Sequence, residues 1–215
     1  MWGMTVLPRP LLRVERVVVG GTNAWVVGDR NECVVLDAPA GDAPSGGPPA
    51  GDAPAVASVA AVVAGRRVQG ILCTHGHRRH IASALTLSDV TGADIYLHPG
   101  DYGLWHEVFP TRWPERVLLD GLTVDVARTQ LVGIHVPGHT DGGMCWYAAE
   151  LGALFTGDSL SADGVGSASS SSDQARLLSA VRARLFTLPM ATTLHPGHGP
   201  DARLGTVRWG RGFWA

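Results

Sequence analysis

The chain has 215 residues, of which 45% are apolar and 17% charged, with a formal net charge of −2 at pH 7. A nearly neutral chain lacks the basic surface of a typical nucleic-acid-binding protein, and no stretch reaches the ~18 apolar residues of a membrane span. Three widely spaced cysteines do not indicate a disulfide framework. The first ten residues do not resemble a signal peptide, so we expect a cytoplasmic protein that binds neither nucleic acid nor membrane.

Short β-branched runs dominate the first half of the chain. Strands are predicted at 11–20, 24–28, 33–37, 70–74 and 94–97. Helices are predicted at 56–64 and 81–91, with a helical turn at 101–107. Between about 39 and 55 the chain is rich in Pro, Gly and Ala and contains few residues that can pack, which predicts a flexible surface loop.

The second half continues the same pattern. Strands are predicted at 122–126, 131–136, 144–148, 153–156 and 192–194, and a helix capped by Asp173 is predicted to run to about residue 188. Many strands with a few helices between them indicate an α/β protein with two sheets covered by helices. We interpret residues 1–215 as one domain, because the strand pattern resumes after the loop at 39–55.

Five of the nine histidines and one aspartate stand beside glycines at the ends of predicted strands. They lie in the motifs THGHRRH, PGHT, TGDS and HPGHG, and are His75, His77, His80, His139, Asp158 and His198. Loops at strand ends are where a rigid sheet holds functional groups, and imidazole with carboxylate suits zinc, iron or manganese. Any one of these residues could equally be a cap or a packed polar side chain, but the whole set in this order indicates a metal site.

This set of motifs resembles that of the metallo-β-lactamase fold hydrolases, in particular their glyoxalase II-like (hydroxyacylglutathione hydrolase-like) branch. The resemblance extends from the first strands to Gly199. It implies a four-layer αββα sandwich with the metal site at one edge, between the two sheets. It also implies a first metal on His75, His77 and His139, and a second metal on His80 and His198, with Asp158 between the two.

One residue departs from the family motif HxHxDH, because this chain has Arg79 at the position of the aspartate. In the family that aspartate binds the second metal, whereas a guanidinium is permanently protonated and has no lone pair to offer. At ~4 Å it would repel a cation by several kcal/mol in an effective dielectric near 20. We therefore expect one metal per chain, with zinc favoured and iron or a second metal as alternatives.

Three functions are compatible with this substitution. The favoured one is a mononuclear hydrolase of a small thioester or ester, in which a metal-bound hydroxide attacks the carbonyl of an acyl-thiol conjugate. The second is a mononuclear iron enzyme similar to the persulfide dioxygenases, with His75, His139 and Asp158 as ligands. The third is a binding protein of the same fold without catalysis.

Asp158 and Arg79 are the candidate catalytic residues. Arg79 is expected to pair with a carboxylate or phosphate, so we expect an anionic acyl-thiol as the substrate. Asp141, two residues after His139, could supply a compensating carboxylate, although a turn before Gly-Gly is its more ordinary role. The C-terminal segment 208–214 is basic and aromatic, and it could cover the mouth of the site, contact a partner subunit or be a frayed tail.

Overall fold

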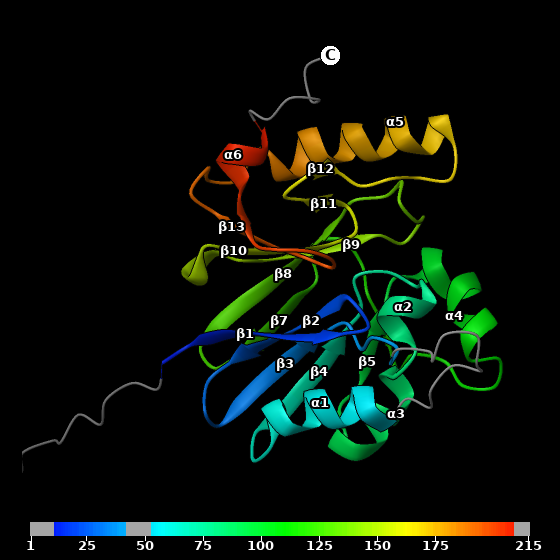
Figure 1. Ribbon diagram of the computed structural model, residues 1–215, viewed down its shortest axis with the longest axis vertical. Helices are drawn as coiled ribbons and strands as arrows, with labels where there is room; N and C mark the ends of the chain where they lie inside the picture. The colour runs from blue at the N-terminus through cyan, green and yellow to red at the C-terminus, as the bar shows by residue number, and fades with distance from the viewer. Residues whose placement is uncertain (1–10, 42–52, 209–215) are drawn as a thin grey trace, which may run out of the picture.

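The computed structural model describes residues 11–41 and 53–208. The first six strands of the chain form one sheet, called sheet A (Figure 1). Its strand order is β1-β2-β3-β4-β5-β6. The strands are β1 (Arg13–Val19), β2 (Thr22–Gly28), β3 (Glu32–Leu36), β4 (Arg67–Leu72), β5 (Ile95–Leu97) and β6 (Arg116–Val117). The first three strands pair antiparallel, and from β3 to β6 the pairs are parallel. The carboxyl ends of β3 and β4 therefore reach the same edge of the sheet.

Sheet B faces sheet A and has the order β14-β13-β10-β9-β8-β7. Its strands are β7 (Thr123–Val126), β8 (Thr129–His135), β9 (Met144–Ala148), β10 (Ala153–Gly157), β13 (Thr193–Pro196) and β14 (Ala202–Arg203). The pair β10–β13 is parallel, and the other pairs of this sheet are antiparallel. A small hairpin of β11 (Leu160–Ser161) and β12 (Gly164–Val165) follows β10.

Helices cover the outer face of each sheet, so that the molecule has four layers (Figure 1). The helices beside sheet A are α1 (Ala53–Val63), α2 (Arg78–Ile81), α3 (Ala84–Thr91) and α4 (Tyr102–Val108). Sheet B is covered by α5 (Ser171–Ala180), which continues as a π-helical turn at Val181–Leu185, and by α6 (Leu204–Arg208). This arrangement is the αββα sandwich of the metallo-β-lactamase fold, so the predicted fold class is confirmed.

Alternating side chains of the central strands enter different apolar layers, which explains the continuous apolar runs in the sequence. In β2, Trp25 packs between the sheets and Val26 packs under the helices of sheet A. In β10, Phe155 packs between the sheets and Leu154 packs under α5. A strand buried on both faces needs apolar residues at successive positions, because successive side chains point to opposite faces.

The helices differ from their predicted bounds, α1 beginning at Ala53 instead of residue 56, and two of the differences have a visible structural cause. The helix predicted at 81–91 is divided into α2 and α3, because the Ser83 hydroxyl donates to the carbonyl of Pro39 and the Ser83 amide donates to that of Ala38. Helix α5 is capped by Ser170, whose hydroxyl accepts from the amide of Asp173. Asp173 is therefore a first-turn residue rather than the cap, and the helix begins earlier than predicted.

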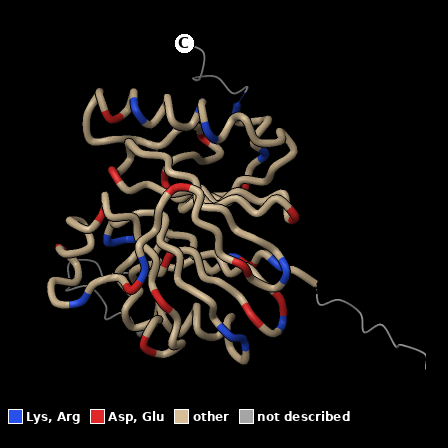
Figure 2. Tube along the Cα trace, turned by 180° about the vertical axis from the view of Figure 1, so that it is seen from behind, with Lys and Arg blue, Asp and Glu red and all other residues tan. Residues whose placement is uncertain are grey.

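The predicted loop at 39–55 lies mostly outside the described residues, as does the C-terminal segment after Arg208. Within the described residues, no helix combines the length and the apolar character needed to cross a membrane. Figure 2 shows acidic and basic residues interspersed over the described trace, without a continuous basic stripe.

Candidate metal centre

The six candidate ligands come together at the edge of the sandwich where strands of both sheets end. His75 and His77 follow β4, and His80 lies in the short helix α2. From sheet B, His139 follows β8, Asp158 follows β10 and His198 follows β13. The three histidines after β4 are close in sequence, but His139, Asp158 and His198 are far from them and from one another along the chain, so only the facing of the two sheets brings the six residues together (Figure 1).

Direct hydrogen bonds hold the two sheets together beside the cluster. The Asn23 side chain donates to the carbonyls of Pro196 and Gly199, at 2.9 and 3.0 Å. The Met144 amide donates to the carbonyl of Thr74 at 2.7 Å. Gly197 lies so close to the cluster that a Cβ there would approach Asp158 Oδ1 and His80 Cε1 to 2.6 Å, so this position requires glycine.

The first half of the centre consists of His75, His77 and His139. One ring nitrogen from each of them lies within 4.8 Å of the others. His77 Nδ1 and His139 Nε2 are 3.0 Å apart, and their rings are nearly perpendicular. Three imidazole nitrogens that converge in this way match the ligand set of a catalytic zinc site, which uses three protein ligands and one open position.

The second half of the centre consists of His80 and His198, whose Nε2 atoms are 3.2 Å apart. Asp158 lies between the halves. Its Oδ1 is 3.4 Å from His80 Nε2 and 3.5 Å from His198 Nε2, and its Oδ2 is 3.6 Å from His139 Nε2 and 3.9 Å from His75 Nε2. The carboxylate thus presents one oxygen to each half.

Hydrogen bonds to the outer ring nitrogens fix which nitrogen of His139 and of His198 faces the centre. His139 Nδ1 donates to the carbonyl of Ser167 at 2.6 Å, and His198 Nδ1 donates to that of Gly21 at 2.9 Å. A carbonyl only accepts, so both Nδ1 atoms carry the proton, and in the neutral ring Nε2 keeps its lone pair. Outer partners of this kind orient metal-binding histidines.

Asp37 is a buried outer partner that the sequence analysis did not single out. It accepts hydrogen bonds from the amide and the hydroxyl of Thr74 and from His80 Nδ1, at 2.7, 2.8 and 2.8 Å. Because the Thr74 hydroxyl donates to Asp37, it accepts from His75 Nδ1, 3.1 Å away, and His75 Nε2 is left facing the centre. Asp37 has φ = 62°, an uncommon value for a non-glycine residue directly after a strand.

Asp101 is a second residue that sequence reasoning missed. It is fully buried, and its carboxylate accepts from the Gly76 amide, the Thr140 hydroxyl and the Gly142 amide, at 2.7, 2.8 and 2.7 Å. It therefore joins the loop that carries His75 and His77 to the loop that carries His139. An aspartate at the start of a helical turn gave no sequence signal of this role.

The electrostatics of the cluster depend on burial and on the charges packed together. Burial, and then the neighbouring His80, lowers the pKa of His75 well below its ordinary value. Burial also disfavours the charged form of His80, but the carboxylates of Asp37 and Asp158 outweigh it and raise the pKa of His80 to about 9. The pKa of Asp158 is lowered, because the surrounding histidines outweigh its burial. Asp158 is therefore ionised and available as a ligand.

Two buried atoms in this cluster have no hydrogen-bond partner within the described part of the chain. They are His75 Nε2 and Asp158 Oδ1, and both face the centre. A buried polar atom without a partner costs about 1–3 kcal/mol, so native proteins seldom leave one unsatisfied. Lone pairs on imidazole and carboxylate that converge on one point are satisfied by a cation, and these residues therefore fit a metal.

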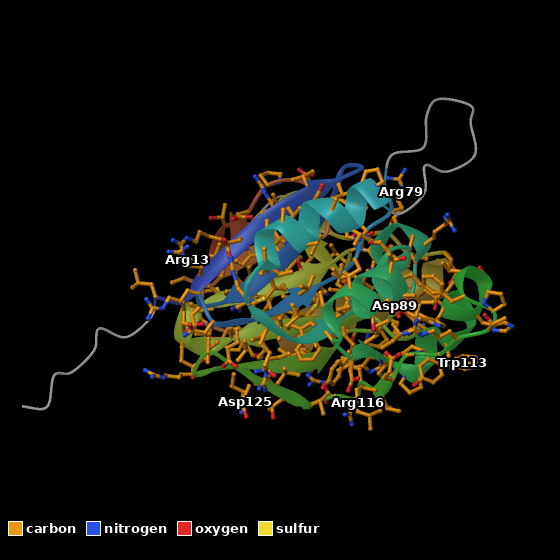
Figure 3. All side chains as sticks on the ribbon, turned by 90° about the horizontal axis from the view of Figure 1, so that it is seen from below. Arg13, Arg79, Asp89, Trp113, Arg116 and Asp125 are labelled. Atoms are coloured by element: carbon orange, nitrogen blue, oxygen red, sulfur yellow. The ribbon has the colours of Figure 1, made fainter. Side chains whose placement is uncertain are left out.

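Arg79 does not join the centre. Its side chain is exposed at the periphery of the molecule (Figure 3), and it lines neither of the two cavities described below. The backbone carbonyl of Arg79 accepts from the Ala40 amide. Asp141, the other candidate carboxylate, is exposed and pairs with Arg176 at 2.5 Å, so it supplies no ligand in this arrangement.

Two further histidines, His98 and His195, make ring contacts away from the centre. His98 is stacked on His135 with ring centroids 4.3 Å apart. His195 packs between Trp25 and Phe155 in the strand that leads to His198. Both lie outside the two halves of the centre.

Two cavities adjoin the centre. The first, of about 400 Å³, is lined by His77 and His139 and by residues of α4 and α5. The second, of about 240 Å³, is lined by His139, Asp158 and His198 and by the hairpin that follows β10. His139 belongs to both, so the centre lies where the two cavities meet.

Comparison with known proteins identifies the family. The sequence matches the metallo-beta-lactamase superfamily over residues 17–203. The chain belongs to this superfamily. An uncharacterized protein of Mycobacterium leprae is 31% identical over 157 residues, which cover 64% of this chain and 72% of that protein.

A hydroxyacylglutathione hydrolase of Pseudomonas aeruginosa is 38% identical over 101 residues, which cover 46% of this chain and 36% of that protein. Among solved structures, the BLEG-1 B3 metallo-beta-lactamase superposes with a TM-score of 0.76 at 22% identity, covering 94% of this chain and 99% of that one. TTHA1623, solved in a di-iron-bound form, superposes with a TM-score of 0.71 at 26% identity and covers the same shares. The predicted superfamily resemblance is thus confirmed, and the chain is a hydrolase-like member.

Proposed function

We propose that this chain is a metal-dependent hydrolase of a small thioester or ester and that it works with a single metal ion. The observation that carries the proposal is the convergence of three histidine nitrogens and the Asp158 carboxylate at one edge of the sandwich, beside two cavities. The partial similarity to hydroxyacylglutathione hydrolase supports thioester chemistry.

His75, His77, His139 and Asp158 would hold the ion, and zinc suits this donor set. When bound, the ion lowers the pKa of a water molecule to about 7 and polarises the acyl carbonyl. The di-iron-bound form of TTHA1623 makes iron the alternative.

The chain's own residues orient the ligands and hold their protons. The carbonyls of Ser167 and Gly21 keep the protons of His139 and His198 on Nδ1, which leaves Nε2 free to donate its lone pair. In the overall reaction the oxygen of water bonds to the acyl carbon, the carbon–sulfur or carbon–oxygen bond breaks, and the thiol or alcohol leaves with a proton.

The use of one metal rather than two rests on the chemistry of position 79. The second half of the centre keeps His80, His198 and Asp158, but it lacks the aspartate of the family motif. Arg79 offers no lone pair in its place. The expected anionic substrate also depended on Arg79, and the exposed position of this side chain gives it no support.

Metal content and thioester hydrolysis test the proposal together. Protein purified without added metal is expected to contain about one equivalent of zinc or iron. It should release thiol from the uncharged thioester S-acetyl-N-acetylcysteamine, lose this activity with a chelator and regain it when the metal is returned. His139→Ala should abolish both metal binding and turnover, whereas His106→Ala, which removes a histidine outside both ligand groups, should leave them unchanged.

A chain without bound metal and without turnover would overturn the proposal and favour the non-catalytic binding protein. Two firmly bound equivalents would overturn only the claim of a single metal.

A further inference from the structure

The charges that line the two cavities beside the metal centre are mostly negative. In the first cavity the acidic residues are Asp101, Glu107, Asp141 and Asp173. The only guanidinium among its described lining residues belongs to Arg176. The described residues that line the second cavity include Asp158 and Asp163 and no arginine. The chain contains no lysine, so no ammonium side chain can compensate.

Arg176 is already neutralised by carboxylates of the protein. Its Nη2 lies 2.5 Å from Asp141 Oδ1 and 3.0 Å from Asp173 Oδ1, so the three side chains together carry a net negative charge. A substrate carboxylate that approached Arg176 would have to displace one of these partners and would also meet the charge of the other. Arg176 is therefore a poor binding group for an anion in this arrangement.

Two further carboxylates are exposed in the cavities. Glu107 on α4 lines the first cavity and Asp163 lines the second, and neither forms an ion pair with an arginine in the described part of the chain. Asp101 is different, because it is fully buried and accepts three hydrogen bonds from the protein. Glu107 and Asp163, together with the net negative group around Arg176, thus set the charge of the cavity walls that face the part of a substrate lying away from the metal.

A separate observation, made at the metal centre between the cavities, indicates that this region binds a ligand. His75 Nε2 is buried, has no hydrogen-bond partner among the described residues and lies 3.9 Å from Oδ2 of Asp158, which lines the second cavity. The acidic lining therefore surrounds a place where groups outside the protein bind, rather than an ordinary solvated surface.

We propose that the leaving group of the substrate, the thiol or alcohol that carries the acyl group, bears no negative charge and that a positively charged carrier is preferred. This inference rests on the proposed thioester or ester hydrolysis and specifies its substrate class. Opposite charges attract across the cavity, and the acidic residues repel a carboxylate, sulfonate or phosphate on the carrier. Glu107 is the specificity-determining residue of the first cavity.

Three thioesters with the same acetyl group and carriers of similar size test the proposal. They are acetylthiocholine, which is cationic, 3,3-dimethylbutyl thioacetate, which is its uncharged analogue, and S-acetyl-2-mercaptoethanesulfonate, which is anionic. The released thiol can be followed with a thiol reagent, because Cys33, Cys73 and Cys145 are all buried. We expect kcat/KM to fall in the order cationic, uncharged, anionic, with about tenfold between the first and the last, as several exposed charge pairs together would give.

Variants that each remove one charge test whether the charged residues of the first cavity cause this preference for a cationic carrier. Glu107→Gln should reduce the ratio of cationic to anionic kcat/KM about threefold. Arg176→Gln should increase the ratio, because it leaves Asp141 and Asp173 without their partner. Asp125→Asn is the matched control, since this exposed residue of β7 lines neither cavity, and the ratio should stay that of the unaltered chain.

The outcomes separate the two proposals. A preference for the anionic thioester, or an equal rate on the cationic and the anionic one, would overturn the charge inference and leave the hydrolase proposal standing. A preference that Glu107→Gln does not reduce would also overturn it. Failure to hydrolyse any of the three, with the metal bound, would overturn the proposed function and this inference with it. High salt should weaken a true charge preference, since it screens exposed charges.

Discussion

The two halves of the candidate metal centre differ in the ligands that they offer to a metal. The first half combines three histidine nitrogens with Asp158 Oδ2. The second half combines two histidines with Asp158 Oδ1, and Arg79 stands where the family motif has a further carboxylate. A catalytic zinc site needs three protein ligands, and the first half supplies them without any contribution from position 79.

This difference shows how a ligand can be replaced without disturbing its neighbours. The structural contact of position 79 is made by its backbone carbonyl, which accepts from Ala40. His80, the next residue, is held independently by Asp37 at 2.8 Å. A change of side chain at position 79 therefore removes a ligand and leaves His80 in place.

The largest expected effect comes from deleting one histidine in each half. His77→Ala should remove the bound metal and the hydrolytic activity, because it takes a ligand from the half that holds the ion. His198→Ala should keep about one equivalent of metal and much of the activity. Metal analysis and thioester hydrolysis of both variants provide the measurement. Equal loss in the two variants would break the distinction between the halves.

Arg79→Asp should allow the second half of the centre to bind a metal ion, as the first half is expected to do. It restores the carboxylate of the family motif at the position before His80, so the metal content should rise from about one to about two equivalents. Arg78→Asp is the matched control, because the neighbouring Arg78 is also exposed and is not at the ligand position of the motif. A metal content that does not change in Arg79→Asp would show that something other than this side chain limits the second half.

Asp37→Asn tests the outer support of the second half. The variant keeps the size of the side chain but removes the charge that orients His80. Loss of such a partner typically costs 10–100-fold in metal affinity. The measurement is competition with a chelator, made on the Arg79→Asp background, where the second half is expected to bind a metal. An unchanged affinity there would mean that Asp37 acts only in folding.

A smaller effect concerns the pH dependence of stability in the metal-free protein. The pKa of His80 is raised to about 9, mainly by Asp37 and Asp158 acting against its burial. A group with a raised pKa contributes stability that is fully present below its unfolded pKa, near 6.5, and is lost as the pH rises through its folded pKa. The free energy of unfolding measured with chelator should therefore fall from about pH 6.5 to 8.5.

The same titration of Asp37→Asn should have a shallower slope, because one of the carboxylates that raise the pKa of His80 is gone. A slope as steep as that of the unaltered chain would mean that the titration of a group other than His80 causes the loss of stability. Above this range the unfolded chain would begin to ionise its cysteines, whose folded pKa values are raised by burial, and stability would fall for that separate reason.

Much of the fold could be predicted from the sequence, since it depends on local patterns. The run at 70–74 predicts a strand buried on both faces, and Ile71 and Leu72 of β4 do pack into different apolar layers. The break between α2 and α3 could not be predicted, because it depends on the contact of Ser83 with Pro39, far away in the chain.

The sequence by itself determined the superfamily, the set of candidate ligands and the substitution at position 79, because motif spacing and residue chemistry are properties of the chain. Only the tertiary structure decided that Asp37 and Asp101 support the ligand loops, that Arg79 lies at the periphery, and that Arg176 is neutralised by Asp141. Except for the exposed position of the Arg79 side chain, each of these features is a contact between residues that are distant in sequence. They arise only when the ends of strands from two sheets meet at one edge, and no local pattern records them.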